Sequence, residues 1–179
     1  MELEEVKLRR SVREGYIVLL RAEALLVMPV GYEKICDFYR RVADACMNWA
    51  VEVYGEHLRA QFLSLASVRE KSGFRTQQYR FWMRVPWEEG DFVTILCESE
   101  RASTDGERDF YRISHTWNTK EQTALPIKQV LQLLEKRPSV KDFPFQPDGV
   151  YRERDKLVIY QNKTDKNVFG EVKLPLQTV

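Results

Sequence analysis

Acidic side chains gather around one Asp-Gly step of the chain. The five carboxylates are Glu98, Glu100, Asp105, Glu107 and Asp109. Paired carboxylates cleave glycosides when they flank a sugar at a fixed separation. Three arginines interleave with these carboxylates, namely Arg101, Arg108 and Arg112. This mixture of charges is more typical of a solvated, salt-bridged hairpin, so a small hydrolase that uses these carboxylates is the alternative interpretation.

Cys97 and His115 form a second pair that could react, as a nucleophile and its base. If the Asp-Gly step forms a two-residue turn, Cys97 faces Ser114 and His115 faces Leu96, on opposite sides of the sheet. A shift of one residue in that turn would bring both side chains to the same side. On the simplest register the pair does not meet, and a hydrolase that uses Cys97 stays an alternative.

The sequence predicts no metal, phosphate or nucleotide site. His57 and His115 are the only histidines, and neither belongs to a short-spaced pair of zinc ligands. No two of the eight glycines are closer than 16 positions, whereas phosphate-binding loops need glycines a few positions apart. The three cysteines, Cys36, Cys46 and Cys97, are an odd number at irregular spacing, which predicts reduced and buried thiols. We therefore expect no cofactor.

The charge balance limits the classes of partner. The 179 residues carry 28 Lys and Arg against 27 Asp and Glu, a formal net charge of +1. This gives no long-range field to hold a nucleic acid or an anionic membrane. The N-terminal segment mixes charges where a signal peptide needs a basic start, and no apolar run approaches the ~18 residues of a spanning helix. We expect one domain, residues 1–179, in the cytoplasm and without a membrane segment.

Hydrophobic periodicity predicts the first elements. Residues 14–28 are rich in apolar side chains and read as a strand that ends at Pro29. An apolar stripe typical of a long amphipathic helix follows, made of Ile35, Tyr39, Val42, Cys46, Trp49 and Val53. After Gly55 the stripe moves over by one position, so we expect the helix to drift or break there.

The apolar period then changes to that of strands. The further predicted strands are residues 74–85, 91–101, 108–117, 156–160 and 168–174. A short second helix follows Pro126, where a proline is favoured at the first helical turn. This order predicts an α+β fold in which a long N-terminal helix packs on a mostly antiparallel meander sheet, with a second short helix and a C-terminal strand pair.

Several segments, in one order, resemble a bacterial domain of unknown function, the RsiV-like domain. The segment YEKICDFYRRVADACMNWAVE (32–52) resembles the first helix of that family. FVTILCESERASTDGERDFYRISHTWNTKEQTALPIKQVLQ (92–132) is similar to its hairpin and the helix after it. DKLVIY (155–160) and VFGEVKLP (168–175) are similar to its closing strands. The resemblance covers residues 14–176.

The resemblance implies a binding or sensing domain without catalytic residues. The family forms the extracytoplasmic half of the lysozyme-sensing RsiV anti-sigma factor and accompanies the catalytic domain of the PdaC peptidoglycan deacetylase. The implied partner is a lysozyme-like protein or a cell-wall (peptidoglycan) fragment. The candidate partner-binding residues are at the hairpin tip, Ser103, Asp105, Glu107 and Arg108, where many relatives have a glycine-rich stretch. A cytosolic dimerisation module is the remaining alternative.

Overall fold

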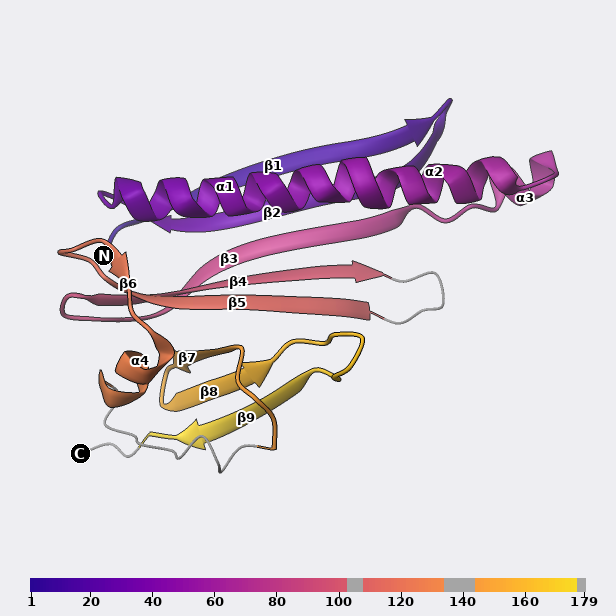
Figure 1. Ribbon diagram of the computed structural model, residues 1–179. Coiled ribbons are helices and arrows are strands. Elements are labelled where there is room, and N and C mark those ends of the chain that lie inside the picture. The colour runs from indigo at the N-terminus through magenta and orange to yellow at the C-terminus, as the bar shows by residue number, and fades with distance from the viewer. Residues whose placement is uncertain (103–107, 134–143, 177–179) are drawn as a thin grey trace.

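The computed structural model describes residues 1–102, 108–133 and 144–176 (Figure 1). The chain begins with an antiparallel hairpin of β1 (Leu3–Glu14) and β2 (Ile17–Pro29). The sequence predicted β2 but not β1, because most side chains of β1 are charged. Its alternating Val6, Leu8 and Val12 nevertheless join the main core, as the inner face of a strand should.

A continuous helix of 32 residues follows, made of α1 (Glu33–Trp49), the π-helical turn η1 (Ala50–Tyr54) and α2 (Gly55–Ser64). A π-helical turn rotates the face that follows it, so the predicted drift of the stripe is confirmed. The predicted break at Gly55 does not occur. Gly55 instead allows close packing, because a Cβ atom at this position would stand only 2.6 Å from Cγ2 of Val12 on β1.

The buried face of the helix differs in part from the predicted stripe. Tyr39 is fully buried as expected, but Trp49 and Val53 are 39% and 55% exposed. Ala43 and Ala50 take the positions that are fully buried. The prediction was wrong for these positions because the stripe was drawn through large apolar residues. A helix that lies close to a sheet can instead place small residues such as alanine against it.

The larger sheet has six strands in the order β1-β2-β3-β4-β5-β6. The elements after the long helix are α3 (Val68–Ser72), β3 (Gln77–Glu89), β4 (Phe92–Ala102), β5 (Arg108–Asn118), β6 (Thr123–Ala124) and α4 (Ile127–Leu133). Neighbouring strands are antiparallel except β2 and β3, which are parallel. The long helix explains this exception, since it spans about 48 Å and returns the chain to the end of the sheet where β2 began.

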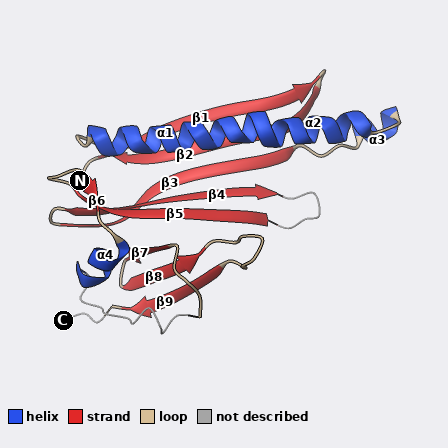
Figure 2. Cartoon of the chain, in the orientation of Figure 1, coloured by secondary structure: helices blue, strands red, loops and turns tan. Residues whose placement is uncertain are grey.

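A second sheet has three strands, β7 (Gly149–Glu153), β8 (Lys156–Gln161) and β9 (Gly170–Pro175). The predicted C-terminal strand pair, β8 and β9, is present, and β7 adds a strand that was not predicted. Leu96 of β4 forms one buried cluster with Tyr151, Val158 and Tyr160 of the second sheet. Figure 2 shows the long helix on one side of the larger sheet and the smaller sheet on the other, an α+β architecture.

The register of the β4–β5 hairpin differs by one residue from the expected one. Cys97 lies opposite Ile113, and Ile95 lies opposite His115. Cys97 and His115 therefore share one face of the sheet, where the two-residue turn predicted opposite faces. That prediction was wrong because Ala102 pairs with Arg108. A two-residue turn at Asp105 and Gly106 would instead pair residues whose numbers sum to 211, one more than in the observed ladder.

Candidate functional site

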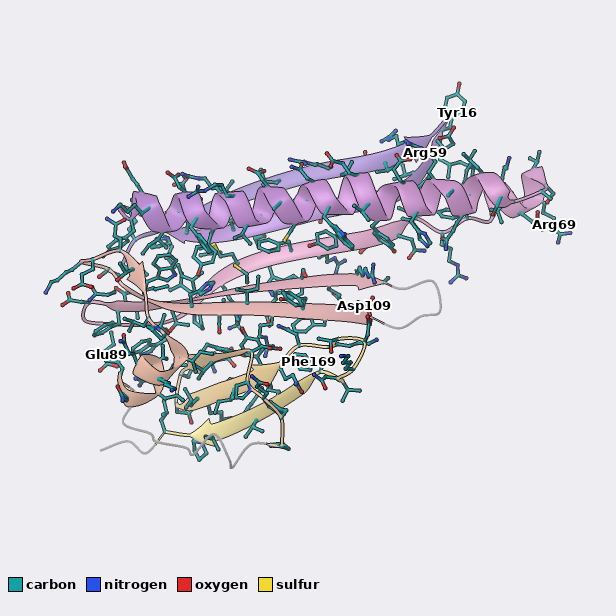
Figure 3. The ribbon with its side chains drawn as sticks, in the orientation of Figure 1. Tyr16, Arg59, Arg69, Glu89, Asp109 and Phe169 are labelled. Atoms are coloured by element: carbon teal, nitrogen blue, oxygen red, sulfur yellow. The ribbon has the colours of Figure 1, made fainter. Side chains whose placement is uncertain are left out.

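A pocket opens where the long helix, the β4–β5 hairpin and the segment after β8 meet. Its volume is about 360 Å³. The lining side chains are Trp49, Tyr79, Ser99, Arg101, Asp109, Phe110, Tyr111, Lys163, Thr164 and Asp165. They come from five separate stretches of the chain, so only the tertiary structure assembles this group. Asp109 stands at the described beginning of β5 (Figure 3).

Arg101 is the central charge of the pocket. Its guanidinium lies 5.5 Å from the ring centres of both Trp49 and Tyr54, which stack on each other at 6.2 Å. Nη2 of Arg101 is 2.6 Å from Oδ2 of Asp109, and Nζ of Lys163 is 3.3 Å from Oδ1. The hydrogen bond from Arg101 holds the pKa of Asp109 below its usual value. The pocket therefore presents ionised groups beside aromatic faces.

The rim offers side chains that a ligand can reach. Trp49 is 39% exposed and Tyr111 is 50% exposed. Lys163 is also exposed, and Thr164 forms a tight turn with Asn167 through paired backbone hydrogen bonds. Exposed aromatic planes and charged or hydroxyl groups suit a polar ligand with apolar faces, such as a sugar or a peptide.

Asn162 fixes the segment that carries Lys163. Its side-chain Oδ1 accepts a hydrogen bond from the backbone N–H of Arg112 at 2.8 Å, and its Nδ2 donates to the carbonyl of Arg112 at 2.8 Å. The amide therefore pairs with β5 much as a neighbouring strand would. Asn162 is only 4% exposed, and its backbone N–H is held by Asp148. The rim of the pocket is thus anchored to both sheets.

Arg101 and Asp109, the described residues on either side of the predicted hairpin tip, line this pocket. Ser103, Asp105 and Glu107 lie outside the described residues. Arg108 is the first residue of β5, and only its backbone is described. The sequence did not single out Tyr111 or Lys163, and it assigned Trp49 to the buried stripe. The available signal was the alternation along β5, which turns Tyr111 toward solvent.

Glu98, one of the candidate acids, is buried in a network of ion pairs. It is 5% exposed, and its Oε1 lies 2.7 Å from Nη2 of Arg112, which is 8% exposed. Its Oε2 accepts a hydrogen bond from Nε1 of Trp82 at 2.8 Å and lies 3.4 Å from Nε of Arg84. The Arg101–Asp109 and Glu98–Arg112 pairs confirm the salt bridges expected of the hairpin in its described part, but the expected solvation is wrong for Glu98 and Arg112, which are buried.

Cys97 and His115 share a face of the sheet, and His115 forms a hydrogen bond with Tyr39. Burial raises the pKa of the Cys97 thiol, which opposes the thiolate that a nucleophile needs. Nε1 of Trp117 donates to the Tyr39 hydroxyl at 3.0 Å, so the Tyr39 proton is free to bond Nδ1 of His115, 2.9 Å away. The neutral imidazole then carries its proton on Nε2. Burial lowers the pKa of His115.

Metal ligands do not come together in the described part of the chain. His57 is exposed on α2 beside Gln61, whereas Cys36 is buried and donates its thiol to the carbonyl of Pro29. Within the described ranges, no group of three or more His, Cys, Asp or Glu side chains is placed to hold a metal ion. The described helices also include none that is long and apolar enough to cross a membrane.

Comparison with solved structures identifies the fold. A DUF3298 family protein from Pseudomonas aeruginosa PAO1 has a TM-score of 0.55 and 12% sequence identity, and the match covers 97% of this chain and 89% of that chain. A DUF3298 family member from Bacteroides fragilis NCTC 9343 has a TM-score of 0.49 and 8% identity, over 97% and 90%. No family model matches the sequence, and no curated protein matches it significantly. The chain thus has the fold of the first protein.

Proposed function

We propose that this chain is a non-enzymatic binding or sensing domain of the RsiV-like type. The observation that carries the proposal is the pocket beside the β4–β5 hairpin. Its volume of about 360 Å³ lies within the range of small-ligand sites, ~300–1,000 Å³. Arg101 and Asp109, which flank the candidate partner-binding tip in sequence, line this pocket.

The side chains of the pocket favour a cell-wall fragment as the ligand. Sugar rings have apolar faces that pack on aromatic planes, and Trp49 and Tyr111 expose such planes. Peptidoglycan stems carry charged groups of both signs, and the ion-paired Arg101, Lys163 and Asp109 offer both signs of charge in the pocket. A lysozyme-like protein, the other partner that the resemblance implies, would contact a larger surface than the pocket.

The burial, ion pairs and pKa shifts of the candidate catalytic residues support a non-enzymatic role. A general acid needs a carboxyl whose pKa lies near the working pH, but the pKa of Asp109 is lowered. Glu98 is held between two arginines. Cys97 is buried with a raised pKa. Each of these groups stabilises the fold or the pocket, and none is poised for proton transfer or nucleophilic attack.

A thermal-shift titration tests the proposal with three probes. Soluble peptidoglycan fragments, a lysozyme and, as a control, an unrelated oligosaccharide are each added to the purified chain. A ligand at 100 times its Kd adds ~2.7 kcal/mol to the free energy of unfolding. We expect a saturable shift with the fragments. A shift with lysozyme alone would replace the cell-wall ligand by a protein, and no shift with either would overturn the proposed function.

Two tyrosines provide matched variants. Tyr111→Ala removes an aromatic plane from the rim of the pocket, and we expect it to weaken fragment binding about tenfold, which is ~1.4 kcal/mol. Tyr16→Ala is the control, since Tyr16 is fully exposed at the β1–β2 turn and does not line the pocket (Figure 3). Equal affinities of the two variants would show that the ligand binds elsewhere.

A further inference from the structure

β1 is the outer strand of the larger sheet. The sheet order places β1 beside β2 alone, so no other described strand pairs with its second edge. The strand is 12 residues long, and its pairing with β2 is regular from Leu3 to Val12, where a register shift occurs. It contains neither proline nor glycine. A long, regular edge of this kind can pair with another strand.

The backbone polarity of β1 follows from one hydrogen bond. The N–H of Val30 donates to the carbonyl of Glu2 at 3.0 Å, so the polar groups of Glu2 point toward β2. Along an antiparallel strand these groups alternate in direction from one residue to the next. Pro29, which has no N–H, lies opposite Leu3 and agrees with this assignment. The residues whose N–H and C=O point to the open edge are therefore Leu3, Glu5, Lys7, Arg9 and Ser11.

The charges of β1 are sorted along the strand. Its first part is acidic, with Glu4 and Glu5 after Glu2, and its later part is basic, with Lys7, Arg9, Arg10 and Arg13. A second copy in the parallel direction would place like charges side by side. A second copy in the antiparallel direction places the acidic part of each strand beside the basic part of the other, as two-fold symmetry allows.

The charges also select one register. A two-fold axis perpendicular to the sheet pairs only residues of the same parity, because each side chain must stay on its own face. With the axis at Val6, Glu5 of each copy faces Lys7 of the other, and Glu2 faces Arg10. With the axis at Lys7, two lysines face each other, and an axis two residues further places Arg9 opposite itself. The axis at Val6 places no like charges directly opposite.

We propose that two copies of this chain pair through β1 in the antiparallel direction, centred on Val6, to form one sheet that continues across the dimer. The outward N–H and C=O groups of Glu5 and Lys7 provide the new hydrogen bonds. The Val6 residues form the close pair at the axis, where Cα atoms are ~4.5 Å apart. The proposal is independent of the ligand pocket, which lies elsewhere in the fold.

Sedimentation of the wild-type chain over a range of concentrations is the first test. We expect a reversible monomer–dimer equilibrium. Lys7→Pro removes an outward N–H without removing a bond to β2, and should give a folded monomer. Ser11→Pro is the matched control, since its N–H also points outward but lies at the end of the proposed pairing, and it should still dimerise. A wild-type monomer at about 1 mM, or a Lys7→Pro dimer, would overturn the proposal.

Cross-linking tests the register separately. The chain with Val6→Cys should form a disulfide-linked dimer under mild oxidation, because the paired Cα atoms fall in the ~4.4–6.8 Å range of disulfides. Lys7→Cys is the control, since two Lys7 positions are too far apart in this register. The wild-type chain measures any cross-linking by its native cysteines. Cross-linking of Lys7→Cys in preference to Val6→Cys would refute the axis at Val6.

Discussion

The substitution Arg112→Met tests whether a buried ion-pair network joins the two sheets. Arg112 lies on β5 and pairs with Glu98 of β4 and with Glu171 of β9. Its guanidinium is surrounded by four aromatic rings at 5.2–5.5 Å, those of Phe110, Tyr151, Tyr160 and Phe169. This one side chain of β5 therefore contacts β4 in its own sheet and all three strands of the second sheet, β7 through Tyr151, β8 through Tyr160 and β9 through Glu171.

The expected loss follows from the charge that is left behind. Removal of one partner from a buried pair costs ~3–5 kcal/mol, because the other charge stays buried without compensation. Glu98 keeps its hydrogen bond from Trp82 and its contact with Arg84, so we expect the lower end, about 3 kcal/mol. With an urea m-value of ~2 kcal/mol per M, the midpoint of unfolding should fall by ~1.5 M.

Urea unfolding followed by tryptophan fluorescence and far-UV circular dichroism measures this loss. The double variant Glu98→Gln with Arg112→Met removes the orphaned charge and should recover part of the stability. Arg152→Met is the surface control, because Arg152 pairs with the exposed Glu89 and should change the stability by less than about 1 kcal/mol. A loss below about 1 kcal/mol for Arg112→Met, equal to that of the control, would refute the network as the link between the sheets.

Three further predictions concern single residues. Burial lowers the pKa of His115 in the folded protein, so between this pKa and the ordinary value of about 6.5 the unfolded chain binds more protons than the folded one. The free energy of unfolding should therefore fall as the pH drops through about 6.5 and level off below the pKa of the folded state. Urea midpoints measured across this pH range should show a smaller loss in His115→Gln. Gly149→Ala should lower the unfolding free energy by ~1–3 kcal/mol, because the new Cβ would stand 2.5–2.8 Å from ring carbons of the buried Tyr160. An unfolding free energy equal to that of the wild type would contradict this. Cys97 should react with a thiol reagent only as fast as the protein opens, because burial raises its pKa, and fast modification of the native state would restore Cys97 as a candidate nucleophile.

Local sequence patterns were sufficient for most elements. The stripe that contains Tyr39 predicted the long helix, and strand periodicity with turn residues predicted β3, β4 and β5 at nearly their observed bounds. Three strands were missed: β6 has only two residues, and β1 and β7 were missed for a shared reason. β1 is an exposed edge strand and carries mostly charged side chains, and β7 is short and follows a proline-rich segment. Neither has the apolar alternation of a half-buried strand over its full length.

The candidate site shows where sequence reasoning stops. The sequence pointed to the hairpin tip, which stays a prediction, and the described residues on either side of it, Arg101 and Asp109, line the pocket. It did not bring Trp49 and Lys163 together, because these residues are separated by more than half of the chain and become neighbours only when the second sheet packs on the first. The register of β4 against β5 could not be predicted from the sequence either, because one residue more or less in the loop decides whether Cys97 and His115 lie on the same face.

The sequence by itself determined the α+β class, the long helix and the mixed charges of the hairpin, because helical and strand periods act over a few neighbouring residues. The tertiary structure decided which helix positions the sheet buries, since Ala50 is fully buried and Trp49 is not. It likewise decided which charges pair across strands. It also decided that Arg112 is an internal link rather than a surface charge. These outcomes depend on contacts between distant segments, whose free energies no local pattern records.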